Sequence, residues 1–222
     1  MSAPARATPA AGATRLAFAT SGLGRAGGAV VTTILSPAAT AGLRDESFAC
    51  LANAHEAYVD EHDGEDDRGG SPDRWLETAV GGPLLRRFYA APLVRALLHR
   101  LTGLEWSPTG TEGTYSFYRR RGHHLGIHRD VDECDLAVIT CLHDAGHEHA
   151  AGEAGTLVVY PGRADEPLSA VRARPNEGAV RVRLPAGQSA IVFGGIVPHR
   201  VAPVVDGQVR VVAPLCYRLA GG

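Results

Sequence analysis

The sequence predicts an α+β fold in which N-terminal helices support a C-terminal antiparallel β-structure. Apolar residues recur at helical spacing in two stretches of the first half, roughly residues 36–58 and 73–102. After Gly103 the chain changes to short β-rich runs separated by glycine and proline, a pattern typical of a sandwich or barrel. These runs are residues 113–118, 127–131, 136–142, 155–160, 168–173, 178–184, 188–194, 199–205 and 208–218.

The first half is marked by clear turn and cap signals. Residues 1–14 are rich in Ala, Pro and Thr and are expected to be disordered. The β-branched run 29–35 predicts a strand, and Ser36-Pro37 then supplies an N-cap residue and a first-turn proline for a helix. The acidic, turn-rich residues 60–72 predict a mobile loop.

A length of 222 residues suits a single domain, which we expect to span residues 15–222. Its helical buttress would cover residues 36–102, broken at Pro83 and Pro92, and its barrel core residues 113–219. The formal net charge of -2 gives no general attraction to nucleic acid or anionic lipid. All 22 basic residues are arginine, which excludes a Schiff-base lysine and a Walker A loop.

The four cysteines, Cys50, Cys134, Cys141 and Cys216, form no C-x-x-C pair. In a chain of this size we expect reduced thiols and a cytoplasmic location. No apolar run approaches the roughly 20 residues needed to span a bilayer.

Three residues could hold a metal ion. His128 and Asp130 are two residues apart in a predicted strand, so they would point to the same face. His199 follows a strongly apolar predicted strand and is the candidate for a third ligand. Two histidines and one carboxylate form the facial triad of non-haem Fe(II) oxygenases, with open positions for a co-substrate and O₂.

A charged residue in an apolar strand adds weight to this interpretation. Arg210 lies in the run Val209-Arg210-Val211-Val212, an expensive place for an unpaired charge. The sequence assigns no acid to it, and a guanidinium fork suits the free end of a dicarboxylate.

These residues and their spacing resemble the Fe(II)/2-oxoglutarate-dependent oxygenases, in particular the prolyl-hydroxylase-like branch. The similarity runs from Tyr115 to Tyr217 and comprises five motifs in order. Val212 departs from the pattern, because the family often has Ser or Thr two residues after the arginine. The five motifs are Tyr118 with Gly122 before His128-x-Asp130, then Ala154-Gly155-Thr156-Leu157, Gly187 to Phe193, His199 to Val204, and Arg210.

The resemblance implies a double-stranded β-helix, a squashed jelly-roll barrel with Fe(II) near one mouth. His128, Asp130 and His199 would be the catalytic metal ligands. Arg210 would bind the C5 carboxylate of 2-oxoglutarate, Tyr118 would donate a hydrogen bond to it, and Thr140 and Leu157 would line its site. The reaction would consume O₂ and release succinate and CO₂, with hydroxylation as the default outcome and desaturation or ring formation as variants.

The sequence predicts a small-molecule substrate, an amino acid or derivative, because no basic stripe or repeat marks a polymer-binding surface. Arg120, Arg121, His123 and His124 precede the metal strand and could contact a carboxylate. Three alternatives stay open: peptidyl or prolyl hydroxylation of a protein, a barrel that binds a ligand without turnover, and a cupin that uses O₂ without 2-oxoglutarate. No nucleic-acid or membrane partner is expected, and the sequence does not reveal the oligomeric state.

Overall fold

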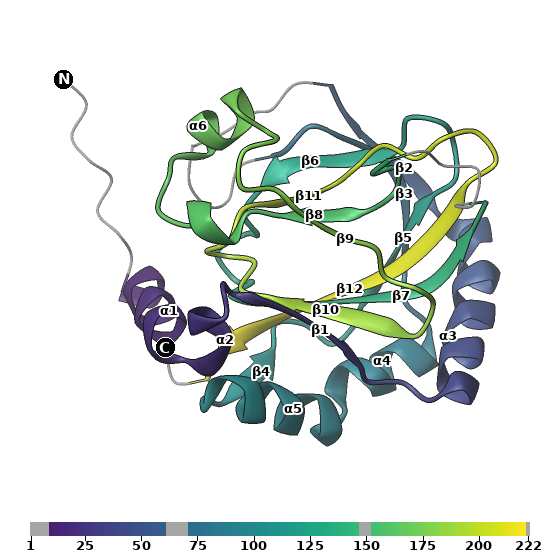
Figure 1. The fold of residues 1–222 in the computed structure, drawn as a ribbon. Helices are drawn as coiled ribbons and strands as arrows, with labels where there is room; N and C mark the ends of the chain where they lie inside the picture. Colours follow the sequence, from purple (N-terminus) through teal and green to yellow (C-terminus); the bar gives the residue numbers. More distant parts are fainter. Residues whose placement is uncertain (1–8, 61–70, 147–151, 221–222) are drawn as a thin grey trace.

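A computed structural model describes residues 9–60, 71–146 and 152–220 of the chain. Its strands form one antiparallel sheet that curls into two layers, in the order β1-β10-β7-β12-β5-β3-β6-β11-β8-β9 (Figure 1). The order ends at β1 and β9, so the curled sheet has an open edge between these two strands. No described helix is long and apolar enough to cross a membrane.

The larger layer has one face covered by helices and one face toward the barrel interior, and the side chains along each of its strands alternate between these two faces. On β12, Leu215 and Tyr217 face the helices, since the Tyr217 hydroxyl donates to the Tyr89 carbonyl oxygen at 2.9 Å. Arg210 lies on the other face of the same strand and therefore points into the barrel. The strands of this layer are β1 (Ala29–Thr33), β10 (Gln188–Val192), β7 (Leu136–Ala145), β12 (Val209–Leu219) and β5 (Thr114–Tyr118).

The smaller layer carries two of the expected metal ligands at the ends of its strands. It consists of β6 (His124–His128), β11 (His199–Val201), β8 (Leu157–Val159) and β9 (Val180–Val182). β3 (Arg74–Val80) pairs with both β5 and β6 and so joins the two layers. β2 (His55–Val59) pairs with β3, and β4 (Trp106–Pro108) pairs with β12.

Helices cover the outer face of the larger layer, as Figure 1 shows for α3 (Pro37–Cys50), α4 (Pro83–Ala90) and α5 (Pro92–Thr102). The Ser36 hydroxyl caps α3 by accepting from the Ala39 amide, and prolines open the first turns of α3, α4 and α5. The Glu46 carboxylate accepts from two amides at the start of α4 and from the Tyr115 hydroxyl. α3 therefore ties the helix layer to the sheet.

Several expectations about individual elements need correction. His55–Val59 and Arg74–Val80 are strands, although helical spacing was expected there. Residues 168–173 form helix α6 (Leu168–Ala173), which lies over β6, and not a strand. Residues 9–14 belong to helix α1 (Pro9–Thr20), followed by α2 (Gly22–Arg25), so that part of the predicted disordered tail is ordered. Most of the acidic loop, residues 61–70, lies outside the described residues.

Candidate active site

The three expected metal ligands converge inside one mouth of the barrel. His128 is the last residue of β6 and pairs directly with His199, the first residue of β11. Their imidazole centres are 4.3 Å apart. Strand β6 ends at His128, so Asp130 is held by the following turn and not by strand alternation. Its Oδ1 still lies 3.5 Å from His128 Nε2 and 3.6 Å from His199 Nε2.

The backbone selects the tautomer of both histidines. His128 Nδ1 is 2.9 Å from the Gly126 carbonyl oxygen, and His199 Nδ1 is 3.0 Å from the Val197 carbonyl oxygen. Because a carbonyl oxygen only accepts, both rings carry their proton on Nδ1 when they are neutral. Both Nε2 lone pairs then face Asp130, which is the arrangement that a metal ion requires.

Asp130 is ionised in this setting. Burial opposes its charge, but in the metal-free site the attraction of the imidazolium forms of His199 and His128, whose Nε2–H then faces the carboxylate, outweighs that effect, so the pKa of Asp130 lies well below its usual range. Burial, followed by the charge of His199, lowers the pKa of His128. The pKa of His199 is raised, because the attraction of Asp130 exceeds the cost of burial. The site therefore offers a carboxylate and two imidazoles within 4.8 Å of one another.

Three further contacts hold the Asp130 turn, and none of them was expected from sequence. The Asp130 amide donates to the Gly194 carbonyl oxygen at 2.8 Å. A Cβ on Gly194 would lie 1.8 Å from Asp130 Oδ2, so only glycine allows this close approach. The buried Arg129 guanidinium donates to the carbonyl oxygens of Ile196, Ala164 and Glu166.

The turn is also linked covalently to β12, which corrects the expectation of reduced thiols. Cys134 and Cys216 form a disulfide across 82 residues of chain. The Cys134 sulfur lies 3.5 Å from Asp130 Oδ2, so the disulfide packs against the carboxylate. Cys50 and Cys141 are free thiols.

Arg210 lies deep inside the barrel, only 1% exposed. The expectation that no acid is assigned to it was wrong, because its Nη1 lies 3.4 Å from Asp144 Oδ2. Asp144 also pairs with Arg183 at 3.1 Å. All hydrogen bonds that Arg210 makes with described residues start from Nη1, toward Asp144, Cys141 and the Leu184 carbonyl oxygen. The Nε and Nη2 side of the fork therefore remains available to a carboxylate.

Two of the other three expected co-substrate residues face the same interior. Tyr118 pairs with Arg210 across β5 and β12, so the side chains share one face. Its hydroxyl makes no hydrogen bond with the described residues, and burial raises its pKa, which keeps it a proton donor. Leu157 lies on the inner face of β8, opposite Val201. Thr140 points the other way: it pairs with Ala213, on the helix-covered face, and its hydroxyl bonds to Ser189 at 2.8 Å.

The expected substrate contacts do not gather at the metal ligands. Arg120 pairs with Glu56 and Glu77, and Arg121 pairs with Asp206. His124 bonds to Asp73, while His123 is buried against the Trp75 ring. Arg119 and Arg163 also have acidic partners, Glu77 and Glu166. These cationic side chains are therefore already matched within the chain.

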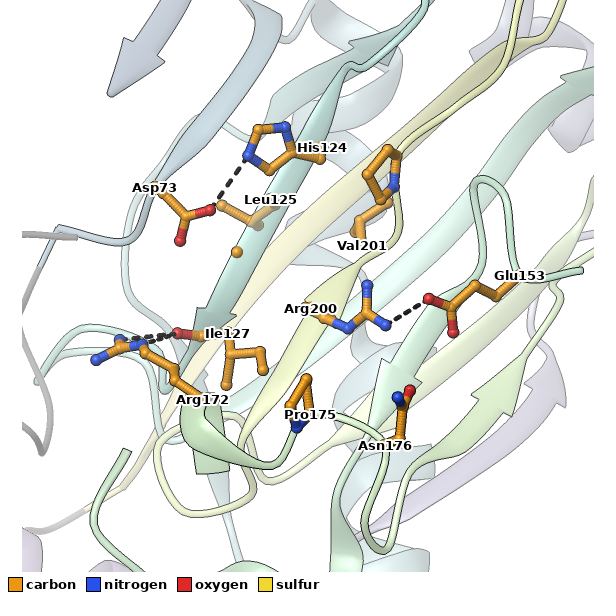
Figure 2. A pocket seen from close by; sticks show the side chains of 12 residues that line it. Asp73, His124, Leu125, Ile127, Glu153, Arg172, Pro175, Asn176, Arg200 and Val201 are labelled. Atoms are coloured by element: carbon orange, nitrogen blue, oxygen red, sulfur yellow. Dashed lines mark hydrogen bonds and ion pairs between the residues drawn. The ribbon is translucent and has the colours of Figure 1, made fainter. Parts of the chain in front are cut away.

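The cavity drawn in Figure 2 has a volume of about 560 Å³. It lies on the face of the smaller layer that is turned away from the barrel interior. Arg200 lines it and points away from the barrel, since its neighbour His199 points inward. The charged groups around it are paired: Arg200 with Glu153, Asp73 with His124, and Arg172 with the Ile127 carbonyl oxygen. His143 does not join the three ligands and packs against Phe48, and residues 147–149, which include two histidines, lie outside the described residues.

Known proteins resemble this chain in three-dimensional structure. No protein-family model and no curated protein matched the chain. Among solved structures, the epimerase SnoN from nogalamycin biosynthesis is similar over 94% of this chain and 82% of its own, with a TM-score of 0.68 and 18% identity. A prolyl-4-hydroxylase from Pseudomonas putida is similar over 94% and 98%, with a TM-score of 0.59 and 18% identity.

AviO1 from Streptomyces viridochromogenes Tue57 is similar over 97% of this chain and 98% of its own, with a TM-score of 0.66 and 16% identity. SnoN is described as a non-haem, α-ketoglutarate-dependent enzyme. The chain has the fold of these proteins. The expected double-stranded β-helix is thus confirmed, with an antiparallel sheet curled around the candidate site.

Proposed function

We propose that the chain is an Fe(II)- and 2-oxoglutarate-dependent oxygenase that acts on a C–H bond of a small molecule. The observation that carries this proposal is the convergence of His128, Asp130 and His199, with both Nε2 atoms facing an ionised carboxylate. Two imidazoles and one carboxylate are the donor set that suits Fe(II) with open coordination positions. When bound, iron with O₂ and 2-oxoglutarate supplies an oxidant able to remove hydrogen from an unactivated carbon.

The chain's own residues position the co-substrate. The free side of the Arg210 fork binds the C5 carboxylate of 2-oxoglutarate, and Asp144 holds the opposite side of the guanidinium in place. The buried Tyr118 hydroxyl donates a hydrogen bond to the same ligand. Leu157 is buried on the inner face of the smaller layer and faces the same barrel interior.

The overall reaction balances for hydroxylation. One C–H substrate, one O₂ and one 2-oxoglutarate give one alcohol, one succinate and one CO₂. One oxygen atom enters the alcohol and the other enters succinate, while the bond between C1 and C2 of 2-oxoglutarate breaks. SnoN has been solved with Fe3+, α-ketoglutarate and nogalamycin RO, which supports a small-molecule substrate for this fold.

The amino-acid substrate expected from sequence has lost its basis, because the arginines that would bind its carboxylate pair with acids of the chain. We therefore propose a small molecule that need not be charged. Modification of a protein is the alternative that the experiment below includes, since similar structures include prolyl hydroxylases.

A cytoplasmic location stays a prediction. The reduced thiols that supported it are not all present, since Cys134 and Cys216 form a disulfide.

The test is Fe(II)-dependent formation of succinate from 2-oxoglutarate, first alone and then with three substrate panels. The panels are ring-bearing natural products, free amino acids and proline-containing peptides. We expect succinate formation that requires Fe(II) and is stimulated most by the first panel. Stimulation by peptides alone would favour protein hydroxylation. No Fe(II)-dependent succinate under any condition would contradict the proposed activity.

A further inference from the structure

An apolar cleft of about 240 Å³ opens where the curled sheet does not close, between β1 and β9. One wall is formed by β1 and β10, and the other by β8 and β9. Val31 pairs with Ala190 on the first wall, and Val180 pairs with Val159 on the second. Every described side chain that lines the cleft is Ala, Val, Leu or Pro.

The cleft borders a strand that pairs with one of the candidate metal ligands. Val159 lies directly opposite His199 across β8 and β11, so the two side chains share the inner face of the smaller layer. On the other wall, Val192 precedes by two residues Gly194, which touches the Asp130 carboxylate. A molecule in the cleft would therefore lie beside the metal ligands.

The lining determines the chemistry of the occupant. A charged or strongly polar group would lose its hydration there without gaining a side-chain partner. An apolar ring would be stabilised by about 25 cal/mol for each Å² that it removes from water. The volume is below the roughly 300–1,000 Å³ of a pocket that encloses a whole small molecule. The cleft thus fits one part of a ligand, about one or two fused rings.

The rim allows the rest of such a ligand to remain outside. Val31 and Val180 stand on the two edge strands of the opening, with 42% and 48% of their surfaces exposed. We propose that this cleft binds an uncharged, ring-bearing part of the substrate and presents it to the metal site. This inference rests on the proposed function, because it names the substrate class of the same site.

The experiment is a fluorescence titration of metal-free protein with N-phenyl-1-naphthylamine, an uncharged two-part aromatic probe. We expect one saturable site per chain. Val31→Asp and Val180→Asp should each raise the Kd about tenfold or more, since the new carboxylate at the rim must be desolvated. Val80→Asp is the matched control, because Val80 is a strand valine outside the cleft with 54% exposure. Non-saturable binding, or equal effects of all three variants, would overturn the proposal.

A second measurement tests the link to the metal site. Mn(II) bound by His128, Asp130 and His199 should broaden the proton NMR signals of the bound probe, because paramagnetic relaxation acts over short distances. Broadening that is absent while Mn(II) and the probe are both bound would also overturn the proposal. If the wild-type chain binds no Mn(II), the proposed oxygenase function fails, whereas the probe titration still decides whether the cleft binds apolar rings.

Discussion

The two halves of the barrel interior have opposite chemistry, although the same strand alternation builds both. In the polar half, around Arg210 and Tyr118, a buried guanidinium has one side held by Asp144 and one side open. The apolar half is the cleft between β1 and β9, whose described lining residues are Ala, Val, Leu and Pro. Of the candidate metal ligands, His199 borders the apolar half because it pairs with Val159, and Asp130 contacts the disulfide to β12, the strand that also carries Arg210.

This contrast shows how one barrel can hold two different molecules at once. A charged co-substrate gains a charge-assisted contact only in the polar half. An apolar substrate gains burial without desolvating a charge only in the apolar half. If the contrast has this meaning, changes in one half should leave ligand binding in the other half intact.

The largest effect is expected in the polar half. Arg210→Gln removes the charge that faces the co-substrate, so the Kd of 2-oxoglutarate for Mn(II)-loaded protein should rise by on the order of 100-fold. The Kd of N-phenyl-1-naphthylamine should stay within about twofold. Calorimetric titrations of both ligands test this separation, with Arg183→Gln as the control, because Arg183 pairs with the same Asp144. Normal 2-oxoglutarate binding with a lowered Tm would mean that Arg210 is structural.

An effect of comparable size is expected from the disulfide link between the metal turn and β12. Replacing both Cys134 and Cys216 by Ser opens an 82-residue loop in the unfolded chain, which should lower the free energy of unfolding by about 2–4 kcal/mol. Mn(II) affinity should fall as well, because the disulfide packs against Asp130. Cys50→Ser is the control, since Cys50 is a free thiol at the end of α3. Denaturant unfolding with unchanged stability, or free thiols at both positions in the wild type, would contradict the link.

A smaller effect is expected in the apolar half. Ala190→Leu adds volume to a wall of the cleft and should weaken probe binding by about tenfold, or roughly 1.4 kcal/mol. The Kd of 2-oxoglutarate should not change beyond about twofold. Thr140→Val, on the helix-covered face of the neighbouring strand, is the control. If Ala190→Leu weakens both ligands equally, the interior is one undivided cavity.

The smallest effect lies outside both halves. The hydrogen bond that His124 donates to the Asp73 carboxylate raises the pKa of His124, so this pair stabilises the fold fully below the ordinary histidine value of about 6.5. The stabilisation is lost as the pH rises through the raised pKa. Asp73→Asn should therefore cost about 0.5–1 kcal/mol at pH 6 and less at pH 9. Denaturant unfolding at pH 6 and at pH 9 measures this loss. An equal loss of unfolding free energy at the two pH values would show that the His124–Asp73 ion pair does not contribute to stability.

The sequence was sufficient to predict the three candidate ligands that the structure brings together, because a short motif carries them. His128, Asp130 and His199 were identified by residue type and order, and Arg210 by its charge in an apolar strand. Short apolar runs were ambiguous: residues 168–173 form a helix and residues 74–80 a strand, because packing against the sheet overrides local preference there.

Contacts between distant segments could not be predicted. Alternation along β7 places Thr140 and Cys141 on opposite faces, but it does not say which face lines the barrel. The partners of Arg120 and Arg121 come from other segments of the chain, as does the partner of Cys134. For the same reason the apolar cleft was invisible in the sequence, since its two walls come from β1, β10, β8 and β9.

The most direct measurement is an anaerobic calorimetric titration of Fe(II) and then 2-oxoglutarate into the wild type, His128→Ala and Asp130→Ala. We expect about one Fe(II) per wild-type chain and 2-oxoglutarate binding that depends on the metal. Both variants should lose metal binding, because each removes one of three ligands. Unchanged Fe(II) binding in either variant would contradict the assignment of the metal site, and so would tight 2-oxoglutarate binding that does not depend on metal.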